Sequence, residues 1–385
     1  MSDIKKLLTV MNEHDASDLY ITVDSPPCYR INGIVRPAGS TQLDENTTYK
    51  LAYSLMTDKQ QAEFTEKKEQ NLALKVEGLG RYRVNIFQQK DAVGMVIRRI
   101  KTSIPTLEGL KLPEILSKLS MSKNGLVLFV GATGSGKSTS LAAMIDFRNS
   151  HQAGHIVTVE DPIEFIHQHK KSIVTQREVG MDTDTYHDAL KNALRQAPDV
   201  VLIGEIRDLE TMEAAINFAE TGHLCLATLH ANNANQAIER VMNFFPPERH
   251  KQIYMQLSLN LRGIVGQRLI PATNGSRAAA VEVMLGTPRI KDLILKAEIE
   301  DIKEAIEKGA ITGMQTFDMH LLELYTSGII SLDTALKYAD SANNLRLKIK
   351  LSDDGSIGET PENAFGEENK EKSSLDFGGI GFIKS

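Results

Sequence analysis

The chain lacks tryptophan and has only two cysteines, Cys28 and Cys225, among its 385 residues. The two cysteines lie far apart and form no CxxC motif, so the sequence predicts neither a disulfide framework nor a zinc knuckle. No window approaches the roughly 18 apolar residues that a membrane-spanning helix needs, and the N-terminus has no apolar signal-peptide core. We therefore expect a cytoplasmic protein, whose association with any membrane would go through a partner.

The chain also has no excess of positive charge. Its formal net charge is -6 at pH 7, and its isoelectric point is about 6.0. A protein built to bind nucleic acid needs a dense basic face that releases counterions from phosphates. We therefore expect no nucleic acid as a partner, although these values leave room for a local basic patch. The length predicts two or three domains.

The first hundred residues predict a small mixed α/β unit. Asn32-Gly33 lies between two strand-like runs, which is the strongest short signal for a β-hairpin. Two prolines and a glycine then interrupt the periodicity of residues 101–113, which we interpret as a linker. The expected helices lie at 3–14 and 47–69, and the expected strands lie at 18–23, 81–87 and 92–100.

From residue 114 onward, strand-like runs alternate with helical patterns, as in a parallel sheet. The segment from about 235 to 345 predicts mostly helices, which we interpret as a bundle appended to the sheet. Residues 352–385 hold eight acidic and three basic side chains and few large apolar ones, a composition typical of disorder. Four short apolar runs fit strands buried on both faces, at 126–130, 155–160, 199–205 and 223–230.

Residues 131–138 read GATGSGKS and fit the pattern G-x-x-x-x-G-K-[ST] between a strand-like and a helix-like run. In this pattern, glycines let backbone N–H groups turn toward nucleotide phosphates, and the helix N-terminus adds positive potential. Lys137 would reach the β and γ oxygens, and Ser138 would bind Mg²⁺. The alternative is an incidental glycine turn. The sequence therefore predicts that ATP with Mg²⁺ binds at Gly131, Ala132, Thr133, Gly134, Ser135, Gly136, Lys137, Ser138 and Thr139.

Hydrolysis also needs groups that hold the metal ion and align a water molecule. Glu205 ends the strand-like run DVVLIGE, where a P-loop ATPase carries its second acidic motif. Glu160 and Glu164 follow another strand, at the sheet edge where ligands bind in open α/β folds. We expect Glu164 to orient or deprotonate the water and Glu160 and Glu205 to help hold Mg²⁺. The alternative in each case is a solvated surface carboxylate.

His223, Cys225 and His230 lie close together in the stretch HLCLATLH. They leave three interpretations: zinc ligands, histidines packed in the core, or histidines that respond to a nucleotide. The zinc interpretation lacks a fourth ligand and the usual loop. Arg83 and Arg98 lie on two strand-like runs of the N-terminal unit, and by themselves they are ordinary surface arginines.

Four motifs occur in a fixed order: GATGSGKSTS, TVEDPIEF, LIGEIRDLET and TGHLCLATLHANNA. This combination resembles the secretion ATPase superfamily, whose members carry a Walker A loop, an Asp box, a Walker B motif and a His box. Over about residues 1–350 the chain is similar to type IV pilus retraction ATPases of the PilT and PilU kind. The stretches QREVG, ETGHL and GMQTFD also match the wording of this family.

The resemblance implies an α/β protein with a PAS-like α+β N-terminal domain over residues 1–100 and a linker over 101–113. A RecA-like P-loop ATPase domain with appended C-terminal helices would follow over 114–350, before a disordered acidic tail at 351–385. The family assembles as a homo-hexamer. The resemblance places Arg83 and Arg98 near the nucleotide. Arg99, next to Arg98 in the sequence, is the residue most easily mistaken for one of them. It implies a catalytic set of Glu164, Glu205, Arg83, Arg98 and His230, with His223 as a further nucleotide-binding residue.

Some segments depart from the PilT kind. RIKDLI at 289–294 stands where that kind usually carries AIRNL, and ANNAN after His230 also differs. The stretch 339–351 is similar to the PilU kind, the accessory partners of the main retraction ATPase. The resemblance therefore implies an ATP-hydrolysing motor subunit for pilus retraction and twitching motility, acting with the main retraction ATPase and an inner-membrane platform protein. The alternatives are an interaction subunit whose ATP is mainly structural, or a nucleic-acid translocase.

Overall fold

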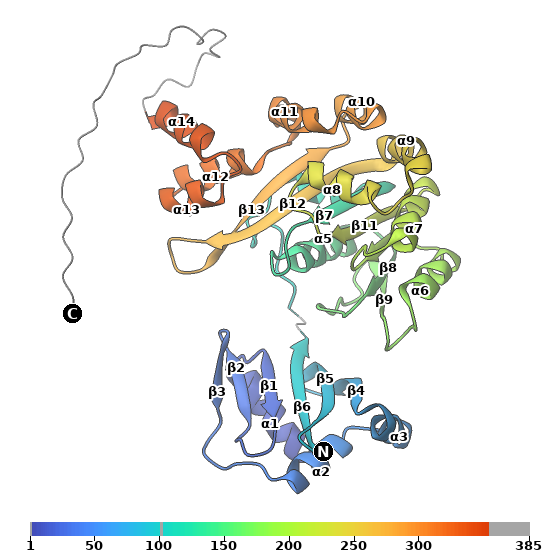
Figure 1. Ribbon diagram of the computed structural model, residues 1–385, viewed down its shortest axis with the longest axis vertical. Helices are drawn as coiled ribbons and strands as arrows, with labels where there is room; N and C mark the ends of the chain where they lie inside the picture. The colour runs from blue at the N-terminus through green and yellow to red at the C-terminus, as the bar shows by residue number, and fades with distance from the viewer. Residues whose placement is uncertain (1, 101–102, 354–385) are drawn as a thin grey trace, which may run out of the picture.

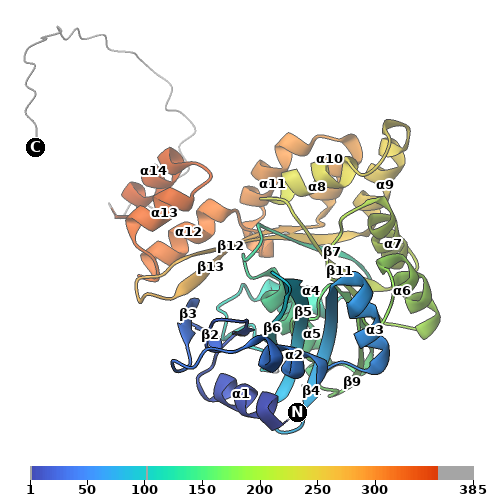
Figure 2. The same cartoon turned by 60° about the horizontal axis from the view of Figure 1, so that its bottom comes forward.

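The computed structural model describes residues 2–100 and 103–353, which form two separate β-sheets (Figures 1 and 2). The smaller sheet has six antiparallel strands in the order β3-β2-β1-β6-β5-β4. Helices α1, α2 and α3 contribute to the core of this part. Its helices are α1 (Ser2–Glu13), α2 (Glu45–Tyr53) and α3 (Asp58–Lys67), and its strands are β1 (Asp18–Ile21), β2 (Cys28–Ile31), β3 (Ile34–Pro37), β4 (Glu69–Val76), β5 (Gly80–Gln89) and β6 (Ala92–Ile100).

The N-terminal part confirms the predicted hairpin. Asn32 and Gly33 both have positive φ, at 50° and 82°, as a two-residue hairpin turn requires. The helix expected at 47–69 is instead two helices, because Thr57 and Gln60 form a capping box that starts the second one. Strand β4 was not predicted, and it pairs with β5 along the edge of the sheet.

The larger sheet has seven strands in the order β13-β12-β7-β11-β10-β8-β9, and only the pair β12–β13 is antiparallel. Its strands are β7 (Gly125–Val130), β8 (Gly154–Glu160), β9 (Ser172–Glu178), β10 (Val200–Ile203), β11 (Leu224–Leu229), β12 (Leu261–Pro271) and β13 (Arg277–Leu285). The accompanying helices are α4 (Ile115–Ser120), α5 (Lys137–His151), α6 (Tyr186–Ala193), α7 (Leu209–Glu220), α8 (Ala234–Met242), α9 (His250–Asn260), α10 (Pro288–Lys296), α11 (Ile302–Lys308), α12 (Phe317–Thr326), α13 (Leu332–Tyr338) and α14 (Ala342–Asp353).

Both faces of this sheet are buried, as the apolar runs predict. Along β7, Val127 and Phe129 pack in one core with α4 and α5, whereas Leu126, Leu128 and Val130 pack in the other core with α6 to α11. Successive strand residues point to opposite faces, so a strand covered on both sides is apolar at every position. The mixed α/β class with a RecA-like sheet agrees with the expected fold.

The segment from 235 to 345 is mostly helical, as expected, but it also contains β12 and β13, which belong to the larger sheet, so the interpretation as a helical bundle appended to the sheet was wrong. Glycines weaken strand propensity, and β12 carries two of them. Tertiary contacts explain why these positions are glycine. A Cβ on Gly266 would lie 2.9 Å from the ring of Phe317, and one on Gly263 would lie 2.8 Å from the carbonyl oxygen of Met284. Helices α12 to α14 pack on the far ends of these two strands.

The segment predicted as a linker is free of helices and strands over residues 103–113. Leu107 and Leu112 are nevertheless buried in one of the two cores of the larger sheet, so this part of the segment packs against that sheet. At the other end, residues 351–353 complete helix α14 and do not belong to a disordered tail. Residues 354–385, for which we also expect disorder, lie outside the described residues.

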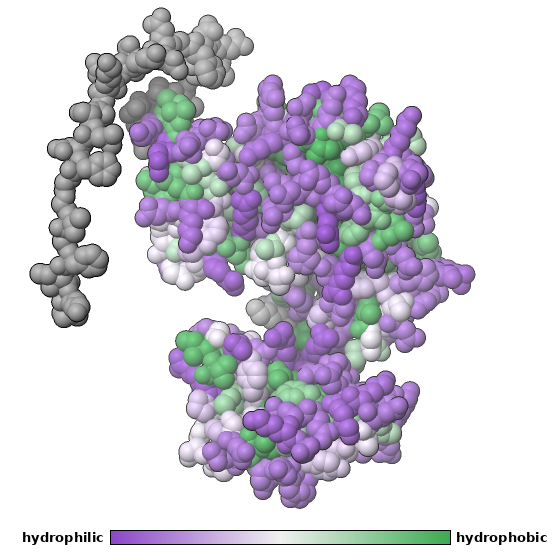
Figure 3. Space-filling view, viewed as in Figure 1, coloured by the Kyte–Doolittle hydropathy of each residue, from purple (hydrophilic) through white to green (hydrophobic). Residues whose placement is uncertain are grey.

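The molecular surface seen in Figure 3 is mainly hydrophilic, with small and separate apolar areas on both parts of the chain. Within residues 2–100 and 103–353, we find no helix that combines the length and apolar character needed to cross a bilayer.

One carboxyl group is buried where β13 meets helix α8. Glu282 is 3% exposed, and its Oε1 accepts a hydrogen bond of 2.7 Å from the backbone N–H of Ala234. Burial raises the pKa of Glu282 from 4.5 to about 7, with a further increase from Asp340 that Arg268 and Lys303 oppose. The folded chain therefore binds this proton more tightly than the unfolded chain does.

Glu282→Gln should therefore remove a pH-dependent loss of stability. A carboxyl whose folded pKa is raised stabilises the fold below pH 4.5, and this contribution disappears as the pH rises through about 7. Relative to the parent chain, the free energy of unfolding of Glu282→Gln should increase by about 3 kcal/mol between pH 5 and pH 8. Urea unfolding at a series of pH values measures this difference. A difference that stays constant with pH would contradict it, and exposed Glu248→Gln is the control.

Candidate functional site

The glycine turn between β7 and α5 has a backbone that side chains would obstruct. Gly131 has a φ of 152°, and a Cβ there would lie 2.4 Å from the backbone oxygen of Gln267. Gly136 has a φ of 90°, and a Cβ there would lie 2.7 Å from the side-chain Nε2 of Gln267. Only glycine combines these conformations with these close contacts. The turn ends at the N-terminus of α5, where unpaired N–H groups favour an anion.

Lys137 is held inside this turn. Its Nζ donates hydrogen bonds to the carbonyl oxygens of Gly131 at 2.7 Å and Ala132 at 3.0 Å. Burial lowers the pKa of Lys137, and the carboxylates of Glu205 and Glu164 oppose this shift. The hydroxyl of Ser135 is also buried in the turn, and it has no hydrogen-bond partner among the described residues. The turn therefore offers a cation and a free donor to a bound phosphate.

Gln267, on β12, fixes the turn from the neighbouring strand. The residue is 3% exposed, and its Nε2 donates a hydrogen bond of 3.0 Å to the carbonyl oxygen of Ser135. Its Oε1 accepts a hydrogen bond of 2.8 Å from the hydroxyl of Ser140 on α5. One buried amide thus connects the turn to the first helical turn that follows it. The sequence analysis missed Gln267 because it expected helices in this segment.

The turn faces three carboxylates across a cavity of 560 Å³ at the carboxyl edge of the sheet. Glu160 ends β8, Glu164 lies in the loop after β8, and Glu205 lies just beyond β10. Parallel strands bring their carboxyl ends to one edge, which explains why these distant residues meet. The predicted residues that line this cavity are Thr133, Gly134, Ser135, Gly136, Lys137, Ser138, Thr139, Glu160, Glu164, Glu205 and His230.

Glu205 is held by two neighbours. Its Oε2 accepts a hydrogen bond of 2.7 Å from Nε of Arg207, and its Oε1 lies 2.8 Å from Nε2 of His230. Arg207 also donates a hydrogen bond of 3.1 Å to Asp161. The hydrogen bond to Glu205 raises the pKa of Arg207 further. Arg207 thereby connects two of the acidic loops. The sequence analysis did not single it out, although its position two residues after Glu205 in the predicted motif could have indicated it.

Glu164 differs from its neighbours because its side chain is exposed to the cavity and forms no ion pair or hydrogen bond among the described residues, although its backbone hydrogen-bonds the carboxyl group of Glu160. Glu160 is more enclosed, and burial raises its pKa to about 7. Its Oε1 accepts hydrogen bonds from Thr158 at 2.7 Å and Gln176 at 3.4 Å. The Glu164 carboxylate is therefore free to contact a substrate, whereas the Glu160 carboxyl group is held by its neighbours in the sheet.

The donor set suits Mg²⁺. This ion prefers hard oxygen ligands, usually one or two carboxylates together with substrate phosphates and water. Ser138, Glu160 and Glu205 all line the cavity and supply hydroxyl and carboxylate oxygens. The geometry does not suit zinc, because His223 and His230 lie at opposite ends of β11 and Cys225 is fully buried between them.

The structure keeps several predicted residues away from this cavity. His223 precedes β11 at the amino edge of the sheet, whereas His230 follows β11 at the carboxyl edge, roughly 20 Å away. His223 lies 3.0 Å from the hydroxyl of Thr221, and Cys225 is fully buried in the core. The role of His223 in nucleotide binding therefore stays a prediction, and its position within this chain does not support it.

The two predicted arginines have different positions in the N-terminal part, and neither lines the cavity. Arg98 donates a hydrogen bond of 2.7 Å to Asp18 within its own sheet. Arg83 extends to the other part of the chain, where its Nε lies 3.9 Å from Oε1 of Glu178 on β9. Neither β9 nor Glu178 was singled out in the sequence, although Glu178 lies within QREVG.

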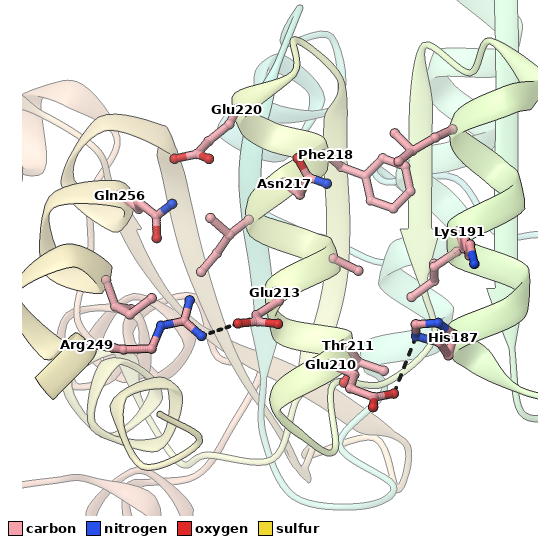
Figure 4. A pocket seen from close by; sticks show the side chains of 15 residues that line it. His187, Lys191, Glu210, Thr211, Glu213, Asn217, Phe218, Glu220, Arg249 and Gln256 are labelled. Atoms are coloured by element: carbon pink, nitrogen blue, oxygen red, sulfur yellow. Dashed lines mark hydrogen bonds and ion pairs between the residues drawn. The ribbon is translucent and has the colours of Figure 1, made fainter. Parts of the chain in front are cut away.

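A second cavity, of 590 Å³, lies between α6, α7 and α9 (Figure 4). Arg249 is paired there with Glu213, and Nδ1 of His187 lies 3.5 Å from Glu210. Figure 4 also shows Glu220 at the same groove. The groove has three glutamates and no glycine turn, so it is a poor site for phosphate. The glycine turn is therefore the better candidate for a phosphate site.

A third cavity, of 640 Å³, adjoins the glycine turn on its other side. It shares Gly136, Thr139, Leu269 and Arg277 with the carboxylate cavity, and the segment 109–112 forms part of its wall. Arg277 and Leu269 come from β13 and β12, so they too were missed when helices were expected. The combination of an anion-binding turn and an adjoining pocket suits a nucleoside phosphate.

Comparison with known proteins agrees with this geometry. The family model described as Type II/IV secretion system protein matches residues 1–336. The Type IV pilus ATPase PilU of Pseudomonas aeruginosa is 56% identical over 350 residues, covering 91% of this chain and 92% of that protein. The Type IV pilus retractation ATPase PilT of the same species is 42% identical, covering 89% of this chain and 99% of that protein.

Solved structures agree as well. A crystal structure of the pilus retraction motor PilT with bound ADP matches with a TM-score of 0.83 and 39% identity, covering 89% of this chain and 98% of that one. The ATPase DotB of Legionella pneumophila matches with a TM-score of 0.73 and 26% identity, covering 87% of this chain and 94% of that one. The chain therefore belongs to the Type II/IV secretion system protein family, among the pilus ATPases of the PilT and PilU kind.

Proposed function

We propose that this protein is an ATP-hydrolysing motor subunit for type IV pilus retraction, and that it acts as the accessory PilU-type ATPase beside the main retraction ATPase. One observation carries the hydrolytic part of the proposal: a buried lysine in a glycine turn faces an unpaired carboxylate, Glu164, across one cavity. The similarity to proteins named PilU and PilT supports the pilus part.

The chemistry is phosphoryl transfer to water. The water oxygen attacks the γ-phosphorus while the bond to the oxygen between the β and γ phosphates breaks, giving ADP and phosphate. Glu164 is the group free to accept the proton of the attacking water. Lys137 and the N–H groups of the turn stabilise the charge on the phosphate oxygens. Mg²⁺, held by Ser138, Glu160 and Glu205, would neutralise part of the phosphate charge when bound.

The adjoining cavity gives a place for the nucleoside. It begins at Gly136 and Thr139, where the phosphates end, and Leu110, Leu112 and Leu269 give it apolar walls. We propose that the ribose and base lie there. Segment 109–112 is also the path from the N-terminal part to the larger sheet, so an occupied pocket would restrain the orientation between the two parts.

Hydrolysis would be coupled to movement through the N-terminal arginines. In a homo-hexameric ring, the loss of the γ-phosphate would release Arg83 and Arg98, and each subunit would then change its angle to its neighbour. Such steps at a pilus base would remove pilin subunits into the inner membrane. The protein would work at the cytoplasmic side, reaching that membrane through a platform protein.

A second candidate is an interaction subunit with bound ATP but little turnover. The contacts of Glu205 favour it, because Arg207 and His230 occupy both of its carboxylate oxygens. Release of these contacts by a neighbouring subunit would then be a condition for hydrolysis. A nucleic-acid translocase has no comparable support, given the net charge of -6.

ATP turnover and particle size should be measured on the full chain, alone and together with the main retraction ATPase. Turnover by the chain alone, in particles of hexamer size, supports the motor. No turnover alone, with turnover in the mixture above that of the main ATPase by itself, supports dependence on the partner. Bound ATP with no turnover alone and no increase over the main ATPase in the mixture would contradict the motor and leave the interaction subunit.

Lys137→Ala should reduce ATP turnover by about 100-fold or more, because the turn loses the cation that stabilises the phosphate charge. Steady-state phosphate release at saturating ATP measures this effect. Lys123→Ala is the matched control, since Lys123 is exposed and has no ion-pair partner among the described residues. Turnover of Lys137→Ala at the parent rate would show that the turn is not the site.

Glu164→Gln should lower kcat by roughly 10²–10⁴-fold while ATP binding stays close to that of the parent, because only the proton acceptor is lost. Binding of a fluorescent ATP analogue and phosphate release separate the two effects. If binding and turnover fall together, Glu164 holds the nucleotide and does not act as the base. Glu248→Gln, an exposed glutamate outside the cavity, serves as the control.

A further inference from the structure

One ion pair joins the two parts of the chain close to the candidate site. Arg83 lies on β5 of the smaller sheet, and Glu178 is the last residue of β9 in the larger sheet. Nε of Arg83 lies 3.9 Å from Oε1 of Glu178. Glu178 is 4% exposed, whereas the Arg83 side chain is about one third exposed. Glu178 is thus buried in the larger sheet, and the partly exposed Arg83 of the N-terminal part pairs with it.

Arg83 is the one cation paired with Glu178 among the described residues. A buried carboxylate without a cation is strongly unfavourable. The ion pair with Glu178 therefore favours the position of Arg83 against the larger sheet. Arg98 lies opposite Arg83 in the β5–β6 register, but Asp18 binds it within the smaller sheet. Two arginines that look equivalent in the sequence therefore have different partners.

The other oxygen of Glu178 reaches the loop that carries the proposed base. Its Oε2 accepts a hydrogen bond of 3.2 Å from the backbone N–H of Ile163, the residue directly before Glu164. Glu178 is also the strand partner of Glu160, and Val179 donates a backbone hydrogen bond of 2.9 Å to the carbonyl oxygen of Glu160. The carboxylate of Glu178 thus connects Arg83 to the loop of Glu164, and the backbone of the same segment is paired with the end of β8.

We propose that Glu178 is a positioning residue for hydrolysis: its carboxylate joins Arg83 of the N-terminal part to the backbone of Ile163 and thereby orients Glu164 toward the nucleotide. The inference rests on the proposed function, since Glu164 has a catalytic role only there. Loss of Arg83 then disturbs the Glu164 loop through Glu178, although Arg83 forms no ion pair or hydrogen bond with that loop among the described residues.

Hydrogen exchange of the Ile163 amide in the full chain, without nucleotide, tests the connection directly. Exchange should rise about tenfold in Arg83→Ala, because the acceptor of this amide loses the cation that holds it. Glu178→Gln should give a similar increase, and the double variant should show no further increase. Arg83→Lys should retain most of the protection, since it keeps the charge. Arg81→Ala, two residues away on the same strand, is the control.

The same variants test the catalytic effect. Arg83→Ala and Glu178→Gln should each lower kcat about threefold to thirtyfold with little change in KM, and their effects should not add in the double variant. Increased exchange with an unchanged kcat, or additive effects of the two variants, would overturn the proposal. So would exchange that rises in Glu178→Gln but not in Arg83→Ala.

The proposed function can fail separately. If the parent chain binds ATP but does not hydrolyse it under any condition, the motor is contradicted, and so is the catalytic part of this inference. The exchange measurements still decide whether Arg83 acts on the Ile163 amide through Glu178, because they need no nucleotide.

Discussion

The buried hydrogen bonds that shape the glycine turn are the constraint on which the rest of the site depends. Lys137 is enclosed by two carbonyl oxygens of the turn, and Gln267 ties the turn to both β12 and α5. A lysine out of water favours its neutral form, and the carboxylates of Glu164 and Glu205 counteract that tendency. The turn and the acidic edge are therefore electrostatically coupled before any substrate binds, which is a form of preorganisation.

The carboxylates at this edge have different surroundings, and we propose different roles for them. Glu205 is engaged by Arg207 and His230, whereas Glu164 is free in the cavity. The same edge receives the N-terminal part through Arg83 and Glu178. In our proposal, this contact couples a chemical step at the edge to the orientation of the N-terminal part, as a motor subunit needs and a simple ATP-binding protein does not.

Local patterns explain which features could be predicted from the sequence. The Asn32-Gly33 hairpin and the glycine turn with Lys137 depend on backbone conformations that a few neighbouring residues determine. Strand β12 could not be predicted this way, because its two glycines reflect contacts with Phe317 and Met284. The pairing of Arg83 with Glu178 likewise joins two sheets, so neither segment alone signals it. The four ordered motifs placed Glu164 and Glu205 at one cavity, and the strand expected over 223–230 already put His223 and His230 at opposite edges of the sheet, although the family motif grouped the two histidines together.

A crystal structure of the full chain with Mg²⁺ and a nonhydrolysable ATP analogue tests the central claim most directly. Our account predicts that the β and γ phosphates occupy the turn of residues 131–138, that Lys137 leaves its two carbonyl partners to bind them, and that the Ser135 hydroxyl gains a partner. It also predicts that Glu164 is the carboxylate nearest to the γ-phosphate. An analogue bound elsewhere, with Lys137 still bound to Gly131 and Ala132, would contradict the account.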